Sequence, residues 1–133
     1  MATTFALKNP KPGVWFRFNE DDPDSGEICI RAVTPGQLKE MIRQTTKKRP
    51  EYKGGQRFVV EEHDEEKFAR LLWDYVIVEW KDLQDEDGNE IPCTVDSKYH
   101  LMMDNIGFAR FVAQCRERVE EDIKKHEEAA EKN

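Results

Sequence analysis

Two short stretches near the start of the chain have the pattern of β-strands, and the first of them alternates apolar and polar residues as a half-buried strand does. In the first, Val14, Phe16 and Phe18 fall on one face, and the second covers residues 27–33 after an acidic, turn-forming stretch. The pattern predicts an antiparallel hairpin. It places Trp15 on the opposite face, where it is either covered by another element or available as an anchor for a partner.

The next residues predict a short amphipathic helix followed by a third strand. Thr34-Pro35-Gly36-Gln37 offers a capping residue, a proline for the first turn and a glutamine that completes a capping box. We expect this helix to end before Pro50, because the residue before proline resists helical geometry. After a flexible link at residues 53–56, Arg57–Glu61 is expected to form the third strand of the same small sheet.

A second helix is predicted to begin at Asp64, a capping residue followed by acidic residues that suit a helix N-terminus. Its later part, around Tyr75–Trp80, is apolar on nearly every side, which admits two interpretations. In the first, the helix continues to Val78 through the centre of the protein. In the second, the β-branched run leaves the helix as a strand.

The C-terminal part predicts two further helices. Residues 96–103 fit a short capped helix, and Asn105 fits the cap of the longest one. Residues beyond Ile123 supply almost no apolar surface, so we expect this end to fray or to project into solvent. The apolar stripe of the long helix consists of Phe108, Phe111, Val112, Cys115, Val119 and Ile123.

These elements predict an α+β fold in a single domain of 133 residues. A small antiparallel sheet, made of the N-terminal hairpin and a third strand, packs with about four helices. The expected parts are a loose N-terminal segment at 1–13, a sheet-containing half at 14–62, a helical half at 63–125 with a turn at 82–94, and a frayed tail at 126–133.

Composition favours a cytoplasmic interaction protein. Charged residues make up 37% of the chain and the net charge is −7. We find no apolar run long enough to cross a bilayer and no signal-peptide pattern at the start. Three widely spaced cysteines fit reduced, buried thiols better than a disulfide framework. Basic and acidic residues occur in separate blocks, which suits the steering of a protein partner.

The acidic stretch around Asp87-Gly88-Asn89 resembles a calcium loop at first sight. With Gly88 at the sixth position, however, the loop would begin at Leu83 and end at Thr94, and neither residue supplies the carboxylate that those positions require. Asp, Gly and Asn tolerate positive φ, so the stretch predicts a turn.

We expect no catalytic site, no metal and no cofactor. The three histidines are scattered and no Cys-x-x-Cys pair is present, which argues against zinc. Nucleophile-elbow and phosphate-loop motifs are absent from the sequence. A pair such as Cys93 with His100 is possible but generic, and Cys93 is the residue to test if the protein is an enzyme.

The order of these features resembles the tail assembly chaperones of tailed bacteriophages and prophages. The resemblance is carried by the capped helix "DEEKFARLLWDYVIVEW", the turn "DLQDEDGNEIPCT" and the helices in "DSKYHLMMDNIGFARFVAQCRERVEE", and it is strongest over residues 64–120. It implies a non-catalytic protein of the bacterial host cytoplasm that is not part of the mature virion. The resemblance also implies binding to the tape measure protein and recruitment of the major tail tube protein. Separately, a second copy of the chain is a candidate partner.

Several residues are candidates for partner contact. They lie in the basic stretch after the first helix, on the N-terminal hairpin and on the long C-terminal helix. They are Lys47, Lys48, Arg49, Lys53, Trp15, Arg116, Val119 and Ile123. The alternative function is a small regulatory or nucleic-acid-binding module that uses the basic stretch 47–57. Nucleic acid is the weaker partner because the overall charge is acidic and no binding motif surrounds that stretch.

Overall fold

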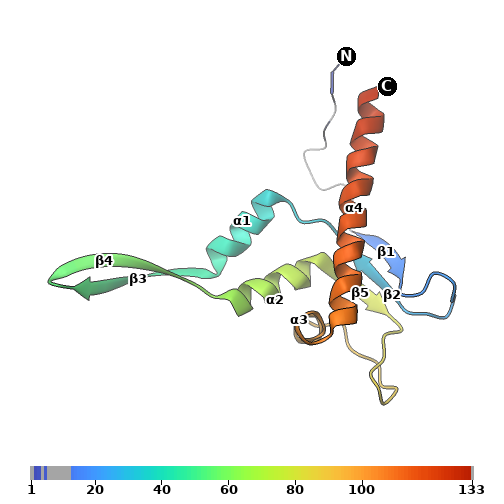
Figure 1. Cartoon of the computed structure of the whole chain (residues 1–133), viewed down its shortest axis with the longest axis horizontal. Helices are drawn as coiled ribbons and strands as arrows, with labels where there is room; N and C mark the ends of the chain where they lie inside the picture. Colours follow the sequence, from blue (N-terminus) through green and yellow to red (C-terminus); the bar gives the residue numbers. More distant parts are fainter. Residues whose placement is uncertain (1, 4, 6–12, 133) are drawn as a thin grey trace.

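The computed structural model describes residues 2–3, 5 and 13–132 (Figure 1). The loose segment expected at residues 1–13 therefore lies for the most part outside the described residues, as does Asn133. The described chain contains four helices and five strands, with three of the helices in the C-terminal half. This confirms the α+β fold. In the described ranges, none of the helices combines the length and apolar character that crossing a membrane requires.

A three-stranded antiparallel sheet forms the base of the core. β1 (Val14–Arg17) and β2 (Glu27–Ile30) make the predicted N-terminal hairpin. β5 (Ile77–Lys81) pairs with the other edge of β2, so β2 is the central strand. Three of the four residues of β2 are buried, since side chains cover both of its faces. The third strand is thus β5 and not Arg57–Glu61, which belongs to a separate hairpin.

Helix α2 (Glu65–Val76) begins at the predicted cap. The carboxylate of Asp64 accepts a hydrogen bond from the backbone N–H of Lys67 at 3.0 Å. The helix ends at Val76, so the interpretation that continues it to Val78 is wrong and the strand alternative is confirmed. β-branched side chains favour extended backbone here.

Helix α4 (Ile106–Lys132) lies across the sheet and closes the core (Figure 1). Its predicted cap is present, because Asn105 Oδ1 accepts from the N–H of Phe108 at 2.9 Å. The helix continues through residues 126–132. For this segment the sequence leaves fraying and projection into solvent both open. Its buried side chains join those of β2, β5 and the end of α2 in one cluster, which consists of Ile28, Ile30, Val76, Ile77, Trp80, Phe108, Val112, Cys115 and Val119.

Helix α3 (Val95–Asp104) lies beside α2 and is one residue longer at each end than predicted. Lys98 on this helix is only 5% exposed. Its ammonium group donates to the carboxylate of Asp74 at 3.0 Å and to the Asp74 carbonyl at 3.3 Å. Arg70 of α2 lies over the ring of Tyr99, 4.4 Å from guanidinium carbon to ring centre. Polar and cation–π contacts therefore join α2 to α3.

The acidic stretch between β5 and α3 is a turn, as predicted. Asp85 Oδ1 accepts from the backbone N–H groups of Asp87 at 2.9 Å and Asn89 at 3.0 Å. The carboxylate is thus used by the amides of its own loop. The loop is fastened to the core by Trp80, whose indole N–H donates to the carbonyl of Ile91 at 2.8 Å.

Helix α1 (Pro35–Gln44) has the predicted capping box. Gln37 N–H donates to Thr34 Oγ1 at 3.2 Å, and Thr34 N–H donates to Gln37 Oε1 at 2.9 Å. None of its residues is buried. It lies against α2, outside the main core (Figure 1).

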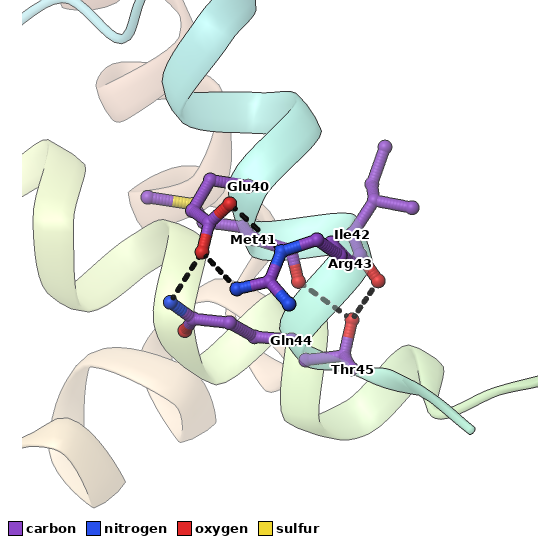
Figure 2. A network of polar contacts seen from close by, with 6 residues as sticks. All are labelled: Glu40, Met41, Ile42, Arg43, Gln44 and Thr45. Atoms are coloured by element: carbon purple, nitrogen blue, oxygen red, sulfur yellow. Dashed lines mark hydrogen bonds and ion pairs between the residues drawn. The ribbon is translucent and has the colours of Figure 1, made fainter.

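Figure 2 shows how α1 ends. The buried hydroxyl of Thr45 donates to the carbonyls of Met41 at 2.8 Å and Ile42 at 3.2 Å, which satisfies groups that a helix end leaves open. On the exposed side, hydrogen bonds from Arg43 and then Gln44 lower the pKa of Glu40 to about 2.

The chain after α1 differs from the expectation. Residues 46–53 form β3 (Thr46–Lys53), with Pro50 inside the strand, and the predicted flexible link at residues 53–56 is a tight turn into β4 (Gln56–His63). A proline is tolerated in a strand only where its missing N–H faces no partner, as at a sheet edge. The sequence-based prediction missed this strand because basic residues are uncommon in central strands. Here they stay in solvent, since this hairpin has no buried face.

The difference between the core and α1 leads to a stability prediction. Ile28 is fully buried and Ile42 is 47% exposed. We expect Ile28→Ala to lower the free energy of unfolding by about 2–5 kcal/mol, because it removes buried surface and leaves a cavity. Ile42→Ala is the matched control and should cost about 1 kcal/mol or less. Urea unfolding followed by tryptophan fluorescence measures both; equal losses would contradict the assignment of the core.

Candidate protein-binding surface

The β3–β4 hairpin, residues 46–63, projects from the body of the protein as an arm (Figure 1). Eight residue pairs form its ladder, from Thr46 opposite His63 to Lys53 opposite Gln56. Gly54 and Gly55 close it with φ of 60° and 78°. Two successive positive φ values are those of a type I′ turn, which matches the twist of a two-stranded ribbon and favours glycine. In the described chain the arm pairs with no third strand.

Large apolar side chains are exposed on both faces of the arm. Opposed residues share a face, so Pro50, Val59 and Tyr52 lie on one side and Phe58 and Val60 on the other. Tyr52 is 72% exposed, Val59 63% and Phe58 48%. A two-stranded ribbon cannot cover such side chains by itself, so they stay in water unless another molecule covers them.

The basic candidates from the sequence all lie on β3, but two of them are paired. Lys48 lies 3.9 Å from a carboxylate oxygen of Glu61, and Arg49 lies 2.6 Å from one of Glu62. The basic side chains of these two ion pairs lie on β3, and the acidic side chains that neutralise them lie on β4. The arm is a surface of mixed charge, which is a less favourable site for a phosphate backbone than an unpaired basic patch.

Among the described residues, the hydrogen bonds and the ring contact that hold the arm to the body lie at its base. Asp64 N–H donates to the carbonyl of Thr45 at 2.8 Å. This hydrogen bond joins the two chain segments at the point where the hairpin leaves α1 and α2. The side chain of Thr46 lies 3.1 Å from Nδ1 of His63, whose ring contacts that of Phe68 on α2 at 5.6 Å between centres. The two ends of the arm are thus adjacent.

Trp15 lies elsewhere, on the sheet face that α4 does not cover. It is 40% exposed, and the ammonium group of Lys81 lies 4.5 Å from its ring centre. Both side chains belong to edge strands that flank the buried Cys29 of β2. Trp15 is therefore open to solvent as one of the two sequence interpretations requires, but the structure does not join it to the arm.

Two of the three candidates on α4 pack in or against the core, and the third contacts a ring on α2. Val119 is 4% exposed and Ile123 packs against the same cluster, so the interpretation of Val119 as a contact residue does not fit this fold. Arg116 lies 5.8 Å from the ring centre of Trp73 on α2. An apolar stripe on a helix has the same spacing in the sequence whether it packs against the core or against a partner.

A groove of about 460 Å³ runs between β5 and residues 90–93, and Cys93 lies on its wall. The pKa of the Cys93 thiol is raised. Burial is the largest cause, and the charge of Lys98 acts in the opposite direction. Burial also raises the pKa of Cys115, to about 11. A nucleophilic cysteine needs a lowered pKa. In the part of the chain that the structure describes, no group of three or more His, Cys, Asp or Glu side chains is arranged to hold a metal ion.

The sequence contains a signal for the arm that the sequence-based prediction of a flexible link at residues 53–56 does not use. Gly54-Gly55 lies between two stretches of equal length, which is the pattern of a two-residue hairpin. The basic run and Pro50 argue against a strand at residues 46–53, because both are rare in central strands. Edge strands tolerate both.

Residues 36–133 match the model of a family described as YdaY prophage protein. The match covers α1 from its second residue, the arm and everything that follows, but not β1 and β2. No curated protein and no solved structure gave a match.

The isolation of the arm predicts that it is dispensable for folding. Residues 48–61 can be replaced by Asn-Gly, which keeps the pair Lys47 and Glu62 and closes it with a type I′ turn. We expect the midpoint of thermal unfolding to change by no more than about 4 °C, because no core contact is lost. Circular dichroism measures this; a collapse of the core would show that the arm supports it.

The thiol environments predict slow alkylation. A raised pKa leaves less thiolate at pH 8, so Cys93 should react with iodoacetamide more slowly than a free thiol in water. Cys115 should be slower still, with a thiolate fraction about a hundredfold below that of an ordinary thiol. Peptide mass spectrometry over time measures the rates, and labelling in urea is the control. Faster reaction of Cys93 than of the free thiol would revive the catalytic interpretation.

Proposed function

We propose that this chain, which belongs to the YdaY prophage protein family, is a non-catalytic tail assembly chaperone that binds the tape measure protein while a phage tail is built. Family membership makes it a prophage protein. The finer role rests on the resemblance of residues 64–120 to assembly chaperones and on the properties of the arm. Such a chaperone acts in the cytoplasm of the bacterial host, can also contact the major tail tube protein, and does not remain in the mature virion.

The observation that carries this proposal is the exposure of Tyr52, Val59 and Phe58 on a projecting ribbon. Exposed aromatic and branched apolar side chains lower solubility, and a cluster of them on a projecting element usually marks a binding surface. Aromatic side chains supply much of the energy of protein interfaces, because they bury a large area at little cost in entropy.

The geometry of the arm suits a helical client. A ribbon with apolar side chains in the middle of a face and charged residues around them matches an amphipathic helix laid across it. The cross-strand ion pairs of Lys48 with Glu61 and of Arg49 with Glu62 present both signs of charge to the polar flanks of such a helix. A long, largely helical tape measure protein would present this kind of surface repeatedly.

The test is co-expression of the chain with the tape measure protein of the same prophage, followed by co-purification. We expect Tyr52→Ser to weaken the complex by about tenfold or more, because it removes the most exposed aromatic ring of the arm. Ile106→Ser is the matched control: Ile106 is also 72% exposed but lies at the start of α4, outside the arm. Its complex should be unchanged.

Two outcomes would contradict the proposal. The first is a wild-type chain that neither co-purifies with the tape measure protein nor reduces its aggregation. The second is equal loss for Tyr52→Ser and Ile106→Ser. Salt-dependent binding of DNA or RNA by the purified chain, lost when Lys47 and Lys53 are changed to Glu, would instead support the nucleic-acid alternative.

A further inference from the structure

The two outer edges of the arm differ in their ability to accept another strand. In a hairpin closed by a two-residue turn, the pair next to the turn is hydrogen-bonded, and bonded and non-bonded pairs then alternate. Lys53 and Gln56 form that first pair, so the backbone groups of Pro50 on β3 and of Val59 on β4 point outward. Pro50 has no N–H to offer, and this blocks the β3 edge.

The β4 edge has no such block. The outward backbone groups belong to Arg57, Val59 and Glu61, each with an N–H and a carbonyl, and no strand of the described chain pairs with them. The side chains of these three residues form the series basic, apolar, acidic. A second copy running antiparallel presents the same series in reverse, so the edge is complementary to itself.

We propose that two copies of the chain associate through their β4 edges, with Val59 at the two-fold axis. Val59 then lies opposite Val59 of the second copy, and Arg57 of each chain lies opposite Glu61 of the other. The result is a four-stranded antiparallel sheet in the order β3, β4, β4, β3. The bodies of the two copies lie at opposite ends, because each arm projects from its own body (Figure 1).

The same register is favourable on the other face of the sheet. Phe58 of each chain lies opposite Val60 of the other, which joins four apolar side chains into one patch. Shifting the register by one pair of residues would place Val59 opposite Glu61 and Phe58 opposite Glu62. The register centred on Val59 places apolar side chains opposite apolar side chains and basic side chains opposite acidic ones. A shifted register loses at least one of these matches.

Association also removes a liability of the isolated arm. A two-stranded ribbon without a covering layer is marginal in water, and three or more strands are needed for a stable sheet. The proposed sheet has four. It does not require the tape measure protein, so it is tested on the purified chain alone, and its failure is separate from any failure of client binding.

The first experiment uses Val59→Pro, which gives β4 the block that Pro50 gives β3. The substitution removes the outward N–H at the two-fold axis, while the bonds from β4 to β3 use the alternate residues and remain. Sedimentation velocity of the wild type at tens of micromolar should show a dimer. Val59→Pro should weaken dimerisation by about tenfold or more, and circular dichroism checks that the core is folded.

The second experiment uses charge reversal and does not depend on proline. Arg57→Glu alone places acid opposite acid, and Glu61→Arg alone places base opposite base, so each variant should dimerise about tenfold more weakly than the wild type. An equimolar mixture of the two should recover dimers, because the acid introduced at position 57 of one chain then meets the base introduced at position 61 of the other. The unchanged Glu61 of the first chain likewise meets the unchanged Arg57 of the second. A change that merely damaged the arm would not be rescued by mixing.

A wild-type chain that stays monomeric up to hundreds of micromolar would overturn the proposal. So would a dimer that survives both Val59→Pro and each charge reversal, since it would use another surface. Exposure elsewhere, as at Ile106 and Met103, provides such an alternative surface. Recovery in the mixture together with loss in each single variant is the result expected only for β4 edges that meet antiparallel.

Discussion

Packing between β2 and α4 holds the rest of the molecule together. Ile28 and Ile30 of the central strand meet Phe108 and Val112 of the helix, and both neighbouring strands are aligned by their pairing with β2. A chain of this length can build only one such core, because too little of its surface is removed from water to support a second. Elements that do not reach β2 or α4 must therefore be held by local contacts.

The arm is the clearest consequence of this constraint. It is tied to the body by the short bond between Asp64 and Thr45 and by contacts at its base, and its twist comes from Gly54-Gly55. Segments with little burial and few tertiary contacts sit at the low end of local stability. A partner that covers the arm adds the burial that the core cannot supply, so binding and ordering of the arm are expected to be coupled.

The distribution of charge follows the same division. Buried charge in the body is satisfied within the fold, as where Lys98 reaches Asp74. On the arm, Lys48 and Arg49 of β3 face acids of β4, but these pairs are exposed and contribute little to stability. If the arm binds a partner as proposed, these charges would restrict which register and which partner meet without repulsion.

Local chemistry determined much of this fold from the sequence alone. The capping box at Thr34, the cap at Asn105, the acidic turn and the strand pair near the start depend on neighbours within a few residues, so their patterns could be read directly. The pairing partners could not be read in this way. Whether Ile77 continued a helix or began a strand depended on β2, which lies far away in the sequence and buries it.

The candidate site divides in the same way. Sequence supplied the basic residues Lys47 and Lys53 and the strand face on which Trp15 lies, because charge and alternation are local properties, but it left open whether Trp15 is covered. It could not tell that Val119 faces the core, since an apolar stripe has the same period whatever it packs against. Only the tertiary structure decided that residues 46–63 leave the body as an arm, because strand pairing and the absence of a covering layer are properties of distant chain segments in space.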